Sequence, residues 1–143
     1  MIATHRGEAT AELAALAKGN GKLMLINCDV TDVDSVKAAA ELIKGKIRTG
    51  ITHLIHNAGV VQCCQDPDLE WEQVSPQEMI DVFKINAIGP LLSMQAFGPL
   101  LAEPSSNHPS PVVAILSSKV GHKIANAPRT LNLYNKVRQS LKI

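Results

Sequence analysis

The residues best suited to chemistry stand where apolar runs end, beginning with Asn57, Ala58 and Gly59. They directly follow the strand-like apolar run 51–55. Small residues let a ligand approach the backbone closely, and the amide of Asn57 can hold a loop or a bound group. In open α/β sheets, ligands bind at the carboxyl edge of the strands. The pattern therefore predicts a nucleotide-type site directly after this run.

Two further apolar runs of strand type, 23–26 and 112–116, also end in polar or small residues. Helical periodicity separates the runs. One helix is predicted over 8–18 and ends at 19–21. A second is predicted over 33–47, with Thr31 or Asp32 as its cap and Gly50 as its stop. Val33 is the first residue of the apolar face of this second helix. Strands that alternate with helices indicate crossover units and a parallel sheet.

A long helix is predicted over 75–101. Ser75 would cap it, Pro76 occupies the first helical position, and Glu78 is placed for a capping box. We expect a bend near Pro90, because proline removes one backbone donor. Residues 62–74 and 103–111 are expected to be loops, and 131–143 the start of another helix.

Composition bounds the classes of function. With 143 residues the chain fits one domain, and 45% hydrophobic against 19% charged residues is ordinary for a globular protein. A net charge of +1 provides no basic field for nucleic acid. No apolar run is long enough for a membrane span, and the first residues do not read as a signal peptide. The expected location is the cytoplasm.

The cysteines and histidines do not predict a metal site or a disulfide framework. An odd count of three cysteines, two of them adjacent and none in C-x-x-C spacing, indicates reduced thiols. The five histidines lack the spacing of metal ligands, so surface or strand-end positions explain them better.

The order of several short motifs resembles that of the short-chain dehydrogenases/reductases. These are Rossmann-fold enzymes that transfer hydride between a nicotinamide cofactor and a carbonyl or alcohol. The motifs are Asp29-Val30, Asn57-Ala58-Gly59, Asn86, Ser118 in Ser-x-x-Gly, and Tyr134. The resemblance extends over essentially the whole chain and implies one incomplete NAD(P)-binding, Rossmann-like domain over 1–143.

The resemblance also implies which residues contact the cofactor. Asp29 and Val30 would touch the adenine, while the segment Asn57, Ala58 and Gly59 would line the adenine ribose. Arg6 lies where NADP-preferring members place a basic residue, and the first six residues hold no acidic side chain for a ribose 2′-hydroxyl. NADP is therefore preferred over NAD, because a guanidinium pairs well with a 2′-phosphate. The alternative for Arg6 is a solvated residue at the start of a helix.

For catalysis, the resemblance implies Tyr134 as the acid/base, Ser118 holding the substrate oxygen, and Asn86 holding a water for proton relay. A free tyrosine has a pKa near 10 and needs a nearby cation to act near neutral pH. The family provides a Lys four residues after the Tyr, where this chain has Arg138. Lys136 would face about 200° away on a helix.

Arg138 departs from the family pattern in a way that matters chemically. Its charge could still lower the pKa of Tyr134, but its planar group cannot replace a compact ammonium in a proton chain. The glycine-rich turn Thr-Gly-x-x-x-Gly-x-Gly, which seats the pyrophosphate on a helix start, is also missing from the sequence. Activity of the chain as it stands is expected to be weak or lost.

The predicted fold class is α/β, a partial Rossmann-type doubly wound parallel sheet that lacks its first strand and its C-terminal strands. In the order 3-2-1-4-5-6 the missing first strand is the middle one. Either the two halves pair directly, or another chain lies between them, or the fold is poor. Stability as a monomer is expected to be low.

Two functions remain open on this interpretation. One is an NADP-dependent oxidoreductase acting on a small carbonyl or alcohol substrate. The other is a non-catalytic truncated relative that serves as an interaction partner, or a partial gene product. No nucleic-acid or membrane partner is expected, and a homo-oligomer could form through the helices that hold Asn86 and Tyr134.

Overall fold

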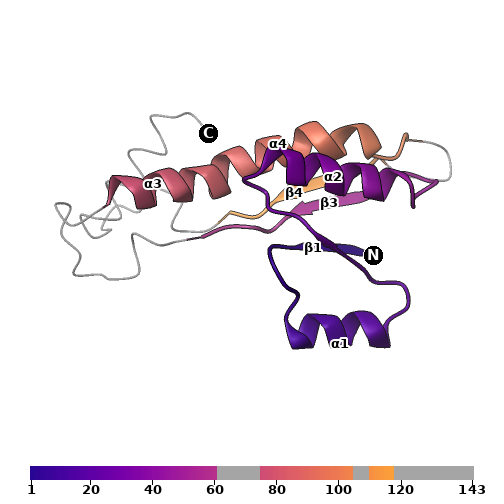
Figure 1. The fold of residues 1–143 in the computed structure, drawn as a ribbon. Helices are drawn as coiled ribbons and strands as arrows, with labels where there is room; N and C mark the ends of the chain where they lie inside the picture. Colours follow the sequence, from indigo (N-terminus) through magenta and orange to yellow (C-terminus); the bar gives the residue numbers. More distant parts are fainter. Residues whose placement is uncertain (61–74, 105–109, 118–143) are drawn as a thin grey trace.

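The computed structural model describes residues 1–60, 75–104 and 110–117, drawn in colour in Figure 1. The elements in chain order are β1 (Ile2–His5), α1 (Ala11–Gly19), β2 (Met24–Asn27), α2 (Val33–Lys44), β3 (His53–His56), α3 (Pro76–Phe83), the π-helix η2 (Lys84–Ile88), α4 (Gly89–Phe97), the 3-10 helix η3 (Gly98–Leu100) and β4 (Val112–Ile115). The loop expected over 62–74 and the helix expected over 131–143 lie outside the described residues.

The four strands form two separate two-stranded sheets. β1 pairs in parallel with β2, and β3 pairs in parallel with β4. Strands of both sheets run in the same direction, and α2 and α4 lie side by side across one face (Figure 1). This arrangement confirms the predicted α/β fold, a partial Rossmann sheet. The two halves of the sheet do not pair with each other in the described part of the chain.

The core lies between α2, α4 and the strands. Asp32 caps α2 by accepting hydrogen bonds from the backbone N–H groups of Asp34 and Ser35. The buried face of α2 is made by Val36, Ala39, Ala40 and Ile43, and these pack with Ile26, Cys28 and Phe97. Burial of this apolar surface is the main term that can hold the two sheets together.

Two details of α2 differ from the sequence-based prediction. The helix ends at Lys44, with Gly45 as its C-cap residue. Val33, expected on the apolar face, is 44% exposed because it is the first helical residue.

Gly50 has a different role from the predicted helix stop. It adopts a φ of +78° in the turn that leads to β3, and a Cβ there would lie 2.6 Å from the Ala102 Cα atom. The adjacent Ile51 bridges in parallel to Leu101. Glycine is therefore required both by the backbone conformation and by the close approach of the segment that follows α4.

The predicted long helix is present but is built from consecutive pieces. α3, η2, α4 and η3 follow one another without a break, and Pro90 is the second residue of α4. The irregularity precedes Pro90: the Gly89 N–H bonds to the Lys84 carbonyl oxygen, one residue further back than in an α-helix. Ser75 is the N-cap residue but makes no side-chain capping bond, so the predicted capping box is wrong.

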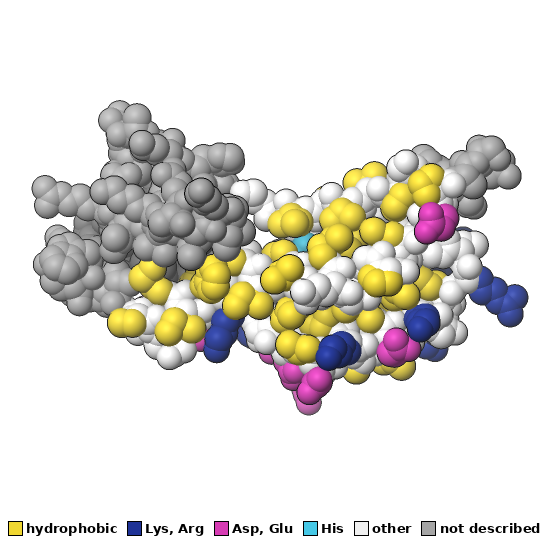
Figure 2. Space-filling view, turned by 90° about the horizontal axis from the view of Figure 1, so that it is seen from above, with side chains coloured by type: hydrophobic (Ala, Val, Ile, Leu, Met, Phe, Trp, Pro, Cys, Tyr) yellow, Lys and Arg dark blue, Asp and Glu magenta, His cyan; other side chains and the backbone are white. Residues whose placement is uncertain are grey.

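Some apolar side chains stay exposed in both layers. On the sheet side they include Ile55, Val112, Ile115 and Leu116, and on the helices Leu42, Ile80 and Leu91. Figure 2 shows hydrophobic side chains gathered on the face seen from above. The strand predicted over 112–116 is confirmed as β4, which pairs only with β3 among the described residues, and within it only Ala114 is half-buried.

Candidate nucleotide site at the carboxyl edge

The end of β2 is held by a network centred on Asp29. The Asp29 N–H donates to the Ser35 Oγ at 2.9 Å. Thr31 donates twice to the Asp29 Oδ1, from its N–H at 2.9 Å and its hydroxyl at 2.7 Å. Such a local turn orders the β2–α2 connection and fixes the carboxylate. The Asp29 side chain thus has a structural role alongside any contact with a ligand.

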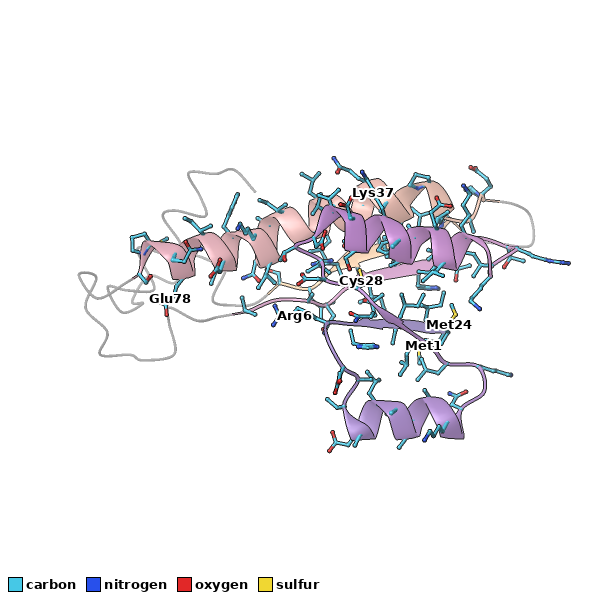
Figure 3. The ribbon with its side chains drawn as sticks, viewed as in Figure 1. Met1, Arg6, Met24, Cys28, Lys37 and Glu78 are labelled. Atoms are coloured by element: carbon cyan, nitrogen blue, oxygen red, sulfur yellow. The ribbon has the colours of Figure 1, made fainter. Side chains whose placement is uncertain are left out.

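Electrostatics at this turn favour the ionised carboxylate. The hydrogen bonds from Thr31 lower the pKa of Asp29, and the charge of Arg6 acts in the same direction. Arg6 itself is exposed and projects near the end of β1, as labelled in Figure 3. Because His5 pairs with Asn27 in the β1–β2 ladder, Arg6 directly follows the end of β1 that neighbours the β2–α2 turn.

Val30 connects the same turn to the long helix. A Cβ added to Gly89 would lie 3.1 Å from the Val30 Cγ2 atom, so the two residues are in close contact. Gly89 is buried at the first position of α4. A larger residue at 89 would push the β2–α2 turn away from the helix.

The end of β3 leaves its small residues accessible. Asn57, Ala58 and Gly59 are all exposed. A Cβ on Gly59 would meet only the Asn86 Oδ1 atom, at an ordinary 3.5 Å. Among the described residues, the backbone of this segment is thus accessible at the carboxyl end of β3.

Asn86 fastens this segment to the long helix. Its Oδ1 accepts from the Val60 N–H at 2.9 Å, and its Nδ2 donates to the Val60 carbonyl oxygen at 2.8 Å. The residue lies in the π-helix Lys84–Ile88. The amide thus bonds to both polar groups of one backbone residue, which fixes the end of β3 against the helix. Sequence reasoning placed Asn86 at the site but missed Val60 as its partner.

His56 is a further polar residue that sequence reasoning did not assign to the site. It is 8% exposed, and burial lowers the pKa of its imidazole while a backbone hydrogen bond to Ala58 raises it. Its Nε2 and the Nδ1 of His5 are buried without a hydrogen-bond partner among the described residues. In the sequence, the only indication of a role for either histidine was its position at the end of a predicted strand.

The Cys28 thiol is not a candidate nucleophile. Burial raises its pKa, the charges of Asp29 and Asp32 raise it further, and a hydrogen bond with Ser35 opposes them. A thiol held protonated in this way is unreactive. No cluster of His, Cys, Asp and Glu able to hold a metal exists within 1–60, 75–104 and 110–117.

The remaining predicted site residues, Ser118, Tyr134 and Arg138, lie outside the described residues. Of the predicted site residues, the structure therefore describes Asn86 and those expected to contact the cofactor. Val30 after β2 lies against Gly89 of α4, and the segment after β3 is bonded to Asn86 in the π-helix, so both strand ends contact the long helix.

Comparison with known proteins agrees with this fold. A family model described as "Enoyl-(Acyl carrier protein) reductase" matches residues 1–141. A "Short-chain dehydrogenase srdF" of Neurospora crassa is 37% identical over 109 residues, which are 71% of this chain and 40% of that protein. The chain belongs to the short-chain dehydrogenase/reductase family.

Solved structures show the same relation. The NADPH-bound carbonyl reductase from chicken fatty liver is 26% identical, with a TM-score of 0.75 that covers 98% of this chain and 56% of that one. Carbonyl reductase Sniffer of D. melanogaster reaches a TM-score of 0.79 at 23% identity, over 98% of this chain and 58% of that one, which shows the shared fold. The chain thus spans little more than half of these structures. None of the described helices is long and apolar enough to cross a membrane.

Proposed function

We propose that this chain provides the adenosine side of an NADP-binding crevice in an oxidoreductase that transfers hydride between nicotinamide and a carbonyl or alcohol. Asp29 and Val30 would contact the adenine, and the segment Asn57–Gly59 its ribose. Arg6 would bind the 2′-phosphate. The single observation that carries the proposal is the β1–β2 register, in which His5 pairs with Asn27, so that Arg6 follows the strand end beside the β2 end that leads to Asp29.

The residues present fit the adenosine part of NADP but not its pyrophosphate. An exposed guanidinium after β1 and an accessible small-residue segment after β3 suit an adenosine bearing a 2′-phosphate. For the pyrophosphate, the sequence has no glycine-rich turn leading into a helix. We therefore propose that binding is weak and that turnover is weak or lost, which the Arg138 substitution would reinforce.

NADPH titration followed by cofactor fluorescence tests this proposal directly. Arg6→Ala should weaken NADPH binding by about tenfold, because a charge-assisted contact to the 2′-phosphate is lost. NADH binding should change little. Arg48→Ala, an exposed arginine away from the strand ends, is the matched control and should leave both cofactors unaffected. Equal effects of the two substitutions would contradict the role of Arg6.

The second candidate is a non-catalytic relative that acts as an interaction partner. It is favoured by the exposed apolar residues on β3 and β4, including Ile55 and Ile115. No NADPH binding at about millimolar cofactor, well above ordinary KM values, would sink the oxidoreductase proposal and leave this one. Measured turnover that disappears in Tyr134→Phe would instead refute the view that the catalytic set is damaged.

A further inference from the structure

The connection between α1 and β2 contains an Asn-Gly pair. Asn20 is followed by Gly21, and no other asparagine in the sequence precedes a glycine. Both residues are exposed, and Figure 1 shows that α1 and this connection stand apart from the layer of α2 and α4. Glycine has no Cβ atom, so it leaves its own nitrogen open to the side chain of the residue before it. The pair lies at the start of β2, at the opposite end of that strand from the candidate nucleotide site.

The backbone nitrogen of Gly21 is not used by the fold. Asn20 is the C-cap residue of α1, with a non-helical φ of -126° and ψ of 92°, and its own N–H donates to the Leu16 carbonyl oxygen at 3.0 Å. The turn that follows is closed by Leu23, whose N–H donates to the Asn20 carbonyl oxygen at 2.9 Å. The Gly21 N–H has no acceptor among the described residues, so its nitrogen is available as a nucleophile.

The Asn20 side chain is activated by the residue that follows the glycine. Its Oδ1 accepts from the Lys22 N–H at 3.1 Å, which folds the side chain back over its own turn. A hydrogen bond to a carbonyl oxygen stabilises the negative charge that develops on that oxygen when a nucleophile attacks the carbon. The Asn20 Cγ atom is thus activated next to a backbone nitrogen that is free to attack it.

We propose that Asn20 is a site of spontaneous deamidation, at which the folded chain is converted to aspartate and isoaspartate forms. The Gly21 nitrogen gives its proton to solvent and forms a bond to the Asn20 Cγ atom. The bond from Cγ to the side-chain nitrogen breaks, and that nitrogen takes a proton from solvent and leaves as ammonia. Water then opens the resulting cyclic imide. Attack at Cγ gives aspartate, and attack at the backbone carbonyl carbon gives isoaspartate.

Both products change the end of α1. A carboxylate at residue 20 places negative charge at the C-terminal end of the helix, which the helix dipole disfavours. In isoaspartate the chain passes through the side chain, so the backbone carbonyl that now accepts from Leu23 becomes a free carboxylate. Because α1 has no buried residue, little packing opposes the loss of this turn. Deamidation should therefore loosen the connection between α1 and β2, and hydrogen exchange at the Leu23 amide should become faster.

The test incubates the full chain at mildly alkaline pH in water labelled with heavy oxygen, without cofactor. Mass spectrometry of proteolytic peptides measures conversion at each asparagine, and an isoaspartyl methyltransferase assay measures isoaspartate. Asn20 should convert at least about tenfold faster than Asn27 or Asn57 in the same molecules. Asn27 precedes Cys28, whose N–H is bonded to a backbone carbonyl oxygen of β1 at 2.8 Å, and Asn57 precedes Ala58, whose methyl group hinders attack.

Two glycine variants on either side of Asn20 form a matched pair. A Cβ on Gly19 or Gly21 would meet nothing within 4 Å, and neither residue has a positive φ, so both alanine variants should fold. Gly21→Ala hinders the attacking nitrogen and should slow the conversion of Asn20 at least about tenfold. Gly19→Ala leaves that nitrogen accessible and should change the rate by less than about twofold. Circular dichroism confirms that both variants are folded.

Three results would overturn the proposal. One is conversion of Asn20 that is no faster than that of Asn27 and Asn57. Another is an equal rate at Asn20 in Gly21→Ala and Gly19→Ala. The third is a rate in the folded chain below about one tenth of the rate in the same chain unfolded in urea, which would show that the turn protects Asn20. Because no cofactor is present, none of these results bears on NADPH binding.

Discussion

The two helices α1 and α2 begin in the same way and end in different environments. Thr10 caps α1 by accepting from the Leu13 N–H, and Asp32 caps α2 by accepting from two N–H groups. Yet α1 has no buried residue, while α2 buries four. Figure 1 shows α1 standing below β1, whereas α2 lies against α4 and the sheets. A local sequence signal is thus enough to start a helix, but only a tertiary partner buries it.

The largest expected effect tests this contrast directly. Ile43→Ala in α2 removes a side chain that is almost fully buried and should lower the free energy of unfolding by about 3 kcal/mol. Leu16→Ala in α1, where the side chain is 63% exposed, should change it by no more than about 0.5 kcal/mol. Urea denaturation followed by circular dichroism measures both. Similar losses in the two variants would mean that α1 is packed as firmly as α2.

A smaller effect is expected at the amide clamp of the packed half. Asn86→Ala removes both bonds to Val60 and should lower the free energy of unfolding by about 2 kcal/mol. Asn86→Asp keeps an acceptor for the Val60 N–H but loses the donor to its carbonyl oxygen. Hydrogen exchange at the Val60 amide should therefore be fast in Asn86→Ala and remain slow in Asn86→Asp. Equally fast exchange in both would show that the Oδ1 contact does not protect the amide.

The smallest expected effect is a dependence of stability on pH. Burial lowers the pKa of His56 in the folded state below its ordinary value of 6.5, so the unfolded chain binds the proton more readily. Stability should therefore be complete above about pH 6.5 and fall as the pH drops below it. His56→Gln should flatten this part of the profile, and the exposed His53→Gln should leave it unchanged. An unaltered slope in His56→Gln would assign the dependence to other groups.

Local chemistry made part of the fold predictable from the sequence. The cap at Asp32, the start of α3 after Ser75, the apolar runs and the small residues after β3 all follow from side-chain type and spacing. The end of α2 was less predictable, because apolar periodicity continues to Ile47 although the helix ends at Lys44. The bare state of α1 was not predictable, since periodicity shows which face of a helix is apolar but not whether anything covers it.

The sequence provided candidate residues for the site but not the contacts that these residues make. Arg6, Asp29 and Asn86 were identified from the sequence through a family resemblance. The bond between Asn86 and Val60 joins positions 26 apart, and no local pattern encodes such a pairing. The role of Gly50 was missed for the same reason, since its close neighbour Ala102 lies far along the chain. Ser118, Tyr134 and Arg138 stay predictions.

The clamp between Asn86 and Val60 also offers a built-in probe of occupancy. The two side-chain amide protons of Asn86 give separate NMR signals, and one of them is committed to the Val60 carbonyl oxygen. Any molecule that settles on the adjoining Gly59 backbone must displace or polarise that contact. A shift of these two NMR signals would report the binding of a molecule beside Gly59, even where no reaction follows.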